Sequence, residues 1–241
     1  MTVLLALDTA TEIMALALSG PACLRLHEGE SGAKASARMV PELMRLLALE
    51  GLSLQDVDAI AFGRGPGAFT GLRTTCAVAQ GLAYGVAKPV LPLDSLMLVA
   101  EDAALQCFAD TLRRGAIWVA MDARMNEIYA ASYRWQGSHW STETGPALFT
   151  REALEACWQI QAPDVVAGSA LEAFGGQLDT GKAVRVPRQQ SRSTSLARVA
   201  QQQWRLGRAL DAALALPLYL RDKVALTTAE RLALRGAQAL A

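Results

Sequence analysis

The chain has no net charge and very few histidines. Its 23 Lys and Arg are balanced by 23 Asp and Glu, and only two of its 241 residues are histidine. A protein whose main task is to grip the nucleic-acid backbone needs a positive excess, so this balance argues against that class. It leaves open a role beside an enzyme that acts on nucleic acid.

Paired cysteines and membrane-length apolar runs are also missing. No two of the four cysteines have the CxxC spacing of zinc ribbons and dithiol redox sites. The chain meets Asp8 after one short apolar run, without the basic region of a secretion signal. No run of about 18 apolar residues occurs. We therefore expect reduced thiols, no membrane contact and a cytoplasmic location.

Glycine, by contrast, is concentrated in one short segment. Residues 63–71 contain four glycines and Pro66, between a strand-like apolar run and a long apolar helix. Backbone N–H groups at such a helix start can bind an anion, and glycines also let another surface approach the backbone closely. A phosphate cradle would want a Lys, whereas the polar candidates here are Thr70 and Arg73. The segment therefore has two competing interpretations.

The two halves of the chain resemble each other. One apolar strand ends at Asp8 and another at Asp122, and each is followed by a short polar turn and a further strand. The run 58–63, which leads into the glycine-rich segment, is echoed by 164–169. These echoes indicate a duplicated unit of roughly 110 residues.

Hydrophobic periodicity completes this unit. The first half reads β-β-β-α-β-α-β-α, which predicts an α/β protein of two packed lobes, 1–105 and 106–216. A C-terminal tail, 217–241, is predicted to end in a helix that packs back on the first lobe. The predicted elements are a strand over 89–93 and helices over 36–49, 72–86, 95–104, 150–158, 194–206 and 228–239.

A duplicated unit of this order, with an Asp at its first turn, resembles the actin/Hsp70/sugar-kinase (ASKHA) superfamily. Four motifs narrow the resemblance, namely Leu7–Glu12, Gly63–Arg73, Ala120–Tyr129 and Pro217–Arg221. Together they resemble those of the bacterial TsaB family, also called YeaZ. The resemblance runs from Met1 to about Lys223 and is weak over 137–210.

The resemblance implies a non-catalytic scaffold or activator subunit, not an enzyme. Members of the family act with a TsaD-like catalyst in threonylcarbamoylation of adenosine 37 (t6A) in tRNAs that read codons beginning with A. The implied partners are the TsaD-like subunit, a TsaE-like ATPase and, when the chain is alone, a second copy, with tRNA reached only through the complex. No cofactor or metal is required, and weak ATP or ADP binding at the subunit junction stays open.

Two helices are expected to form the partner interface. Helix 36–49 carries more apolar surface than one buried stripe needs, and helix 71–85 is expected to expose small side chains. In the family these helices contact TsaD. A Leu43→Asp or Ala79→Arg change is then expected to abolish the complex and leave the monomer folded. The predicted interface residues are Arg38, Met39, Leu43, Leu46, Leu47, Thr75, Cys76, Ala79, Gln80 and Ala83.

Enzymatic alternatives have less support. TsaD-like relatives hold a metal through HxxxH on a helix, but His27 and His139 lie far apart, which disfavours metal catalysis and a peptidase. The stronger alternative is a weak ATP-binding or phosphotransfer enzyme, in which Asp8 would hold Mg²⁺. Asp8 could equally cap its own turn. The candidate vestigial nucleotide or anion loop comprises Asp8, Thr9, Gly65, Gly67, Thr70, Gly71 and Arg73.

A basic stretch lies outside the family pattern. Residues 180–210 contain no Asp or Glu. The plain interpretation is a solvated basic surface, and the alternative is a contact with the tRNA backbone inside the complex. Charge reversal at Arg188 and Arg192 would then weaken tRNA binding most at low salt. The cations of the stretch are Lys182, Arg185, Arg188, Arg192, Arg198, Arg205 and Arg208.

Overall fold

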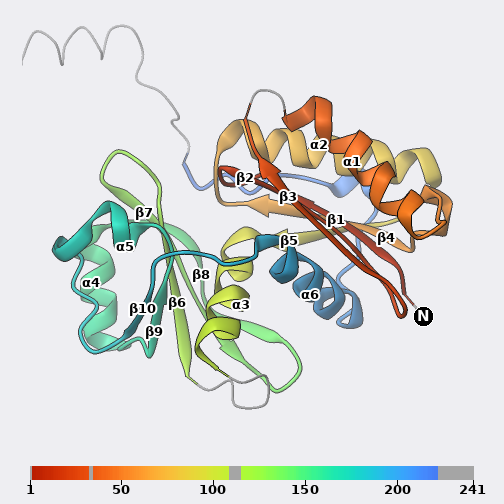
Figure 1. Cartoon of the computed structure of the whole chain (residues 1–241). Helices are drawn as coiled ribbons and strands as arrows, with labels where there is room; N and C mark the ends of the chain where they lie inside the picture. Colours follow the sequence, from red (N-terminus) through yellow and green to blue (C-terminus); the bar gives the residue numbers. More distant parts are fainter. Residues whose placement is uncertain (1, 33–34, 109–114, 222–241) are drawn as a thin grey trace, which may run out of the picture.

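The computed structural model describes residues 2–32, 35–108 and 115–221, which form two α/β lobes (Figure 1). The first sheet has the strand order β3-β2-β1-β4-β5, and the second has the order β10-β9-β6-β7-β8. In each sheet the first three strands along the chain pair antiparallel and the last two are parallel. Because the two orders match, the duplicated actin-like α/β fold predicted from the sequence is confirmed.

The first half follows the predicted order β-β-β-α-β-α-β-α. A 3₁₀ turn, Leu54–Asp56, precedes β4. The observed strands are β1 (Leu4–Asp8), β2 (Ile13–Ser19), β3 (Leu24–Glu30), β4 (Ala59–Gly65) and β5 (Val90–Asp94), and the helices are α1 (Ala35–Leu49), α2 (Phe69–Val86) and α3 (Ser95–Cys107).

The second half repeats the order. Its strand β9 lies within the echo 164–169, whereas the short strand β10 was not located by the sequence pattern. Two further 3₁₀ turns occupy Gly175–Gln177 and Ala212–Leu214. The predicted tail helix, 228–239, lies outside the described residues. The observed strands are β6 (Ala116–Asp122), β7 (Glu127–Trp135), β8 (Trp140–Thr150), β9 (Val165–Ala167) and β10 (Val184–Val186), and the helices are α4 (Arg151–Ile160), α5 (Ala170–Ala173) and α6 (Arg192–Arg205).

Side-chain caps determine where several helices begin. The Asp94 carboxylate accepts the Leu96 amide at the start of α3. Thr150 caps α4, and Ser191 caps α6 by accepting the Thr194 amide. The start of α6 is therefore at a defined place, which matters for the site described below.

Helices α3 and α6 lie between the two sheets (Figure 1). Although α6 follows the second sheet in sequence, it packs on β1 and β2 of the first, while α3 contacts β6 and β7 of the second. One hydrophobic core joins the inner faces of both sheets through these helices, with Leu4, Leu98, Val119 and Leu196 among its buried members. The lobes therefore share a core layer.

Helices α1 and α2 cover the opposite, outer face of the first sheet (Figure 1). Their buried stripes meet Leu16 and Phe62 of that sheet. Within the described residues, no helix combines the length and apolar character needed to cross a membrane.

Candidate functional site

Asp8 ends β1 at the bottom of the region between the lobes, and its carboxylate is fully buried. Oδ1 accepts the Ala10 amide at 3.1 Å and Nε of Arg192 at 2.7 Å. Oδ2 accepts the hydroxyl of Ser95 at 3.0 Å. The interpretation of Asp8 as a cap of its own turn is confirmed, and the structure adds a buried ion pair.

Arg192 is the first residue of α6 and is only 1% exposed. Besides Asp8, its guanidinium donates from Nη1 to Oε1 of Gln189 at 2.7 Å and from Nη2 to the Ser95 carbonyl at 3.5 Å. Sequence reasoning placed Arg192 in a basic stretch and missed this pair. No local pattern could have found it, because the partners lie at opposite ends of the chain.

The glycines at 63–71 are required by contacts with the chain's own first turn. A Cβ at Gly63 would lie 1.6 Å from Oδ2 of Asp8, and one at Gly71 would lie 1.9 Å from the carbonyl oxygen of Thr9. A Cβ at Gly67 would lie 2.4 Å from the Ala10 carbonyl oxygen. Real side chains cannot make such contacts. The glycines therefore admit the turn 8–10 against the backbone, which is the second of the two interpretations given above.

An actin-like fold implies a magnesium nucleotide between the lobes, and the residues at this position do not fit one. Both oxygens of Asp8 are occupied by donors of the chain itself. The guanidinium of Arg73 lies 3.9 Å from the centre of the Phe69 ring and Nε donates to the Tyr219 hydroxyl, so it serves the chain's own packing. Among the described residues, no group of three His, Cys, Asp or Glu side chains could hold a metal ion.

The second turn, after β6, is equally occupied. Oδ1 of Asp122 accepts the Arg124 amide at 2.8 Å, and Oδ2 lies 3.2 Å from Nη1 of the same arginine. Arg124, Met125 and Asn126 have φ of 63°, 56° and 58°, a left-handed run without glycine. Such residues are uncommon in this conformation, and their side chains leave less room for a phosphate than glycines would.

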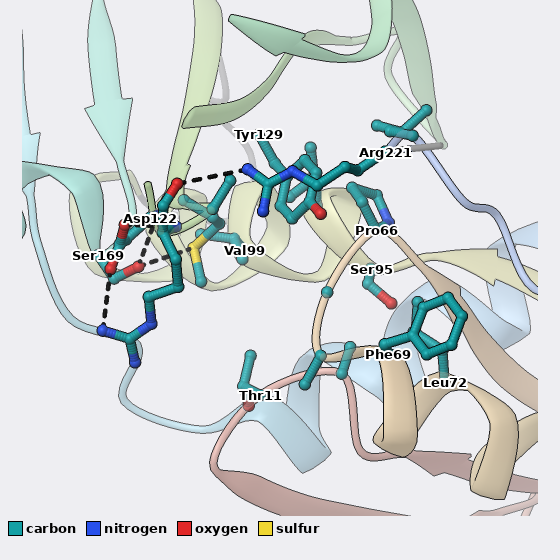
Figure 2. A pocket seen from close by; sticks show the side chains of 18 of the residues that line it. Thr11, Pro66, Phe69, Leu72, Ser95, Val99, Asp122, Tyr129, Ser169 and Arg221 are labelled. Atoms are coloured by element: carbon teal, nitrogen blue, oxygen red, sulfur yellow. Dashed lines mark hydrogen bonds and ion pairs between the residues drawn. The ribbon is translucent and has the colours of Figure 1, made fainter. Parts of the chain in front are cut away.

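A cavity of about 600 Å³ separates these two turns (Figure 2). Apolar side chains such as Leu72, Val99 and Tyr129 line it together with Ser95 and Arg192. Residues 218–221 form part of its wall. The predicted motif Pro217–Arg221 therefore lies at the region between the lobes.

This C-terminal segment, 217–221, is called the strap below. The Leu218 amide donates to the Arg64 carbonyl at 2.7 Å, which holds the strap to the glycine-rich segment of the first half. Arg221 forms an ion pair with Glu127 and donates to the Arg124 carbonyl at 3.3 Å. The strap thus bridges the two halves across the cavity.

The side chains predicted to form the partner interface are mostly inaccessible. The prediction that α2 exposes Thr75, Cys76, Ala79 and Ala83 is wrong, because the small residues let α2 lie close to the sheet. Most of the apolar surface of α1 packs inside the lobe, whereas Leu49 is 55% exposed. Arg38 is exposed, and Gln80 is half-buried with its Nε2 donating to the Ala212 carbonyl at 3.0 Å. The buried residues of the predicted set are Met39, Leu43, Leu46, Leu47, Thr75, Cys76, Ala79 and Ala83.

The accessible surface of the two helices is made of other residues. On α2 it includes Ala77, Gly81 and Tyr84, and a Cβ at Gly81 would meet nothing within 4 Å. Tyr84 is 58% exposed and lies near these small side chains on the helix. The outward side of α2 is therefore formed by small side chains and one large, partly apolar ring.

Carboxylates neutralise part of the basic stretch. Arg188 pairs with Glu172 at 2.6 Å and Arg198 pairs with Glu101 at 2.6 Å. The inclusion of Arg192 in a solvated or tRNA-contacting surface is wrong, because this side chain is buried against Asp8. Of the two residues named for charge reversal, only Arg188 is exposed.

Asp94 and Tyr133 form a further contact between the halves, since the Tyr133 hydroxyl donates to Oδ2 of Asp94. Burial raises the pKa of the Asp94 carboxyl above its ordinary value of 3.8, although the Tyr133 hydroxyl opposes this shift. Burial and the neighbouring Asp94 carboxylate raise the pKa of Tyr133 well above 10.0. The pair therefore joins β5 of the first half to β7 of the second through a partly buried hydrogen bond.

Comparison of the sequence with protein families identifies one match and several relatives. Residues 30–163, more than half of the chain, match the family model described as TsaD, tRNA N6-adenosine threonylcarbamoyltransferase. The tRNA threonylcarbamoyladenosine biosynthesis protein TsaB of Escherichia coli is 32% identical over 92% of this chain and 96% of its own length. The protein of the same name from Haemophilus influenzae is 42% identical over 52% of this chain and 51% of its own.

Solved structures agree with these relatives. YeaZ from Pseudomonas aeruginosa superposes with a TM-score of 0.79 at 32% identity, over 91% of this chain and all of that one. A second Pseudomonas aeruginosa structure, described as similar to peptidase YEAZ, gives a TM-score of 0.81 at 33% identity over 92% of this chain and all of that one.

Proposed function

The chain belongs to the TsaB family, within the wider group that the TsaD model describes, and on this premise we propose that it takes part in the biosynthesis of threonylcarbamoyladenosine in tRNA. The E. coli relative is named for this process and is similar over almost its entire length. The finer proposal is that the modified base is adenosine 37 of tRNAs that read codons beginning with A.

We propose further that the chain is a non-catalytic subunit that docks a TsaD-like catalyst. The observation that carries this proposal is the state of Asp8, whose two oxygens are engaged by Arg192, Ser95 and the Ala10 amide. Three of the roughly four lone-pair sites of this carboxylate are thus engaged by the chain itself, and the carboxylate is shielded from solvent. We therefore propose that the cleft needs no cofactor, while a nucleotide at the subunit junction stays an open prediction.

The docking surface that we propose is the outward face of α1 and α2. It has small side chains at Ala77 and Gly81 and a large exposed ring at Tyr84, features that permit close helix packing against a partner. A second copy of the chain would use the same face when the TsaD-like subunit is absent. A TsaE-like ATPase would join the assembled pair.

Gel filtration of the chain mixed with a TsaD-like subunit tests the docking proposal. A heterodimer is expected for the unchanged chain and is expected to be lost with Gly81→Arg or Ala77→Arg, which alter exposed positions. Ala156→Arg, at an exposed position of α4, is the matched control and should leave the complex intact. A heterodimer that survives both α2 substitutions would contradict the proposed surface.

A turnover assay distinguishes the phosphotransfer alternative from the proposed non-catalytic role. The chain alone, with ATP and Mg²⁺, is expected to show no hydrolysis or transfer at ordinary enzyme rates of about 1 s⁻¹ or more. Contact with tRNA is proposed only through the complex. Arg188→Glu tests it, and unchanged affinity with an unchanged salt slope would remove this part of the proposal.

A further inference from the structure

Carboxylates of the first half hold the start of α6 from three sides. Asp8 accepts Nε of Arg192, and Asp102 accepts the amides of Gln190 at 3.0 Å and Ser191 at 2.9 Å. Glu28 of β3 accepts the Ser193 amide at 2.8 Å. The N–H groups and the positive end of the helix dipole, which could attract an anionic ligand, are thus satisfied by the chain's own side chains.

Arg192 is the centre of this arrangement. Its three donor nitrogens each reach a different acceptor, on Asp8, Gln189 and Ser95. The planar guanidinium fork matches such a set of acceptors, whereas the compact ammonium of Lys would not span it. The pair with Asp8 is almost completely removed from water, at 1% and 0% side-chain exposure.

We propose that Arg192 is a resident counter-ion that takes the place of a bound cation at Asp8. It neutralises the carboxylate at the base of the cleft and fastens the start of α6 to the end of β1. Because α6 is connected directly to the second sheet through β10, the fastening also holds the second half against the first. The two-lobed arrangement is then maintained without a ligand.

The consequence for docking rests on the proposed function. The turn 8–10 that Arg192 holds is packed against Gly63, Gly67 and Gly71, and these glycines lead into α2. A fixed turn therefore fixes the start of a helix in the proposed docking surface. The tests below use the chain alone, so a failure to bind a TsaD-like subunit would leave them unaffected.

A double-mutant cycle of melting temperatures measures how strongly Asp8 and Arg192 stabilise each other. Arg192→Met removes the cation and leaves the Asp8 carboxylate buried and uncompensated, which is expected to lower Tm by roughly 10 °C. Arg188→Met, which breaks an exposed ion pair, is the matched control and should shift Tm by no more than about 2 °C. In Asp8→Asn/Arg192→Met the loss should be clearly smaller than the sum of the two single losses. Additive losses, or equal shifts for Arg192→Met and the control, would overturn the proposal.

Hydrogen exchange distinguishes a local role of the ion pair from a general stabilisation of the fold. A local role predicts faster exchange only in the segments that the pair holds together. In Arg192→Met, amides of 8–12, 63–68 and 189–196 are expected to exchange at least about tenfold faster under native conditions. The β7–β8 hairpin at 135–145 should be unchanged. If that variant does not fold, Arg192→Lys, which keeps the charge without the fork, serves for the same measurement. Unaltered exchange in the three segments, or equal acceleration in the hairpin, would refute the proposed role.

Discussion

The ring of Tyr219 stacks on that of Phe69, with centroids 4.6 Å apart and planes inclined by 29°. The two residues are distant in sequence, and the stack is one of the contacts that hold the strap to the first lobe. On the other side of the cavity the strap is held by the pair of Arg221 with Glu127. A short C-terminal motif therefore contributes to the arrangement of both halves.

Removal of the Tyr219 ring should destabilise the chain measurably. Tyr219→Ala loses the stack and part of the burial of a half-exposed ring, and we expect the free energy of unfolding to fall by about 2 kcal/mol in urea titration. Tyr219→Phe retains the stack and loses only the hydrogen bond from Arg73, at a cost of about 0.5–1 kcal/mol. Equal losses for the two variants would show that the stack contributes nothing.

Replacing a glycine by alanine should change the free energy of unfolding in opposite directions at two positions of the chain. Gly63→Ala would place a methyl group against the buried Asp8 carboxylate, so we expect a loss of about 3 kcal/mol or more. Gly81 lies on the open side of α2, and Gly81→Ala should stabilise the chain by about 0.5–1 kcal/mol through helix propensity. Urea titration of both variants makes the comparison, and a tolerated Gly63→Ala would contradict the packing described.

Substitutions at the buried positions of α1 should lower the stability of the fold and should not act by changing a docking surface. Leu43 is fully buried, so Leu43→Ala is expected to cost about 3 kcal/mol in chemical denaturation. For the same reason the expectation that Leu43→Asp and Ala79→Arg leave the monomer folded is withdrawn. Circular dichroism should show both variants unfolded or strongly destabilised, and a native-like melting curve for either would contradict the observed burial.

Acid stability should depend on Asp94. Its folded pKa is raised, so its contribution to stability is present below about pH 3.8 and is lost as pH rises through the raised value. Asp94→Asn has no proton to lose. The difference between variant and parent in unfolding free energy should therefore shift in favour of the variant as pH rises from about 3.8 through the raised pKa. Tyr133→Phe removes the bond that lowers the pKa and should extend the loss to higher pH, whereas parallel pH profiles for all three proteins would reject the assignment.

Much of the fold was predictable because its signals are local. Apolar runs that end at Asp8 and Asp122, the glycines at 63–71 and the periodicity of α1 indicated the elements and their repetition. The short strand β10 was not located, because three residues carry too little pattern. The buried side of α2 was misassigned, because small residues look alike whether they face a partner or the chain's own sheet.

The sequence by itself determined the fold class, the family and the absence of a histidine pair for a metal site, since these depend on residue type and on spacing along the chain. The tertiary structure decided what the conspicuous residues do. The glycines at 63–71 allow the turn that begins at Asp8 to pack against their backbone. Arg192, which the sequence places in a basic stretch, is buried and neutralises the Asp8 carboxylate. Neither fact could be read from the sequence, because burial and pairing arise only when strand β1 and helix α6 are brought together by the folded chain.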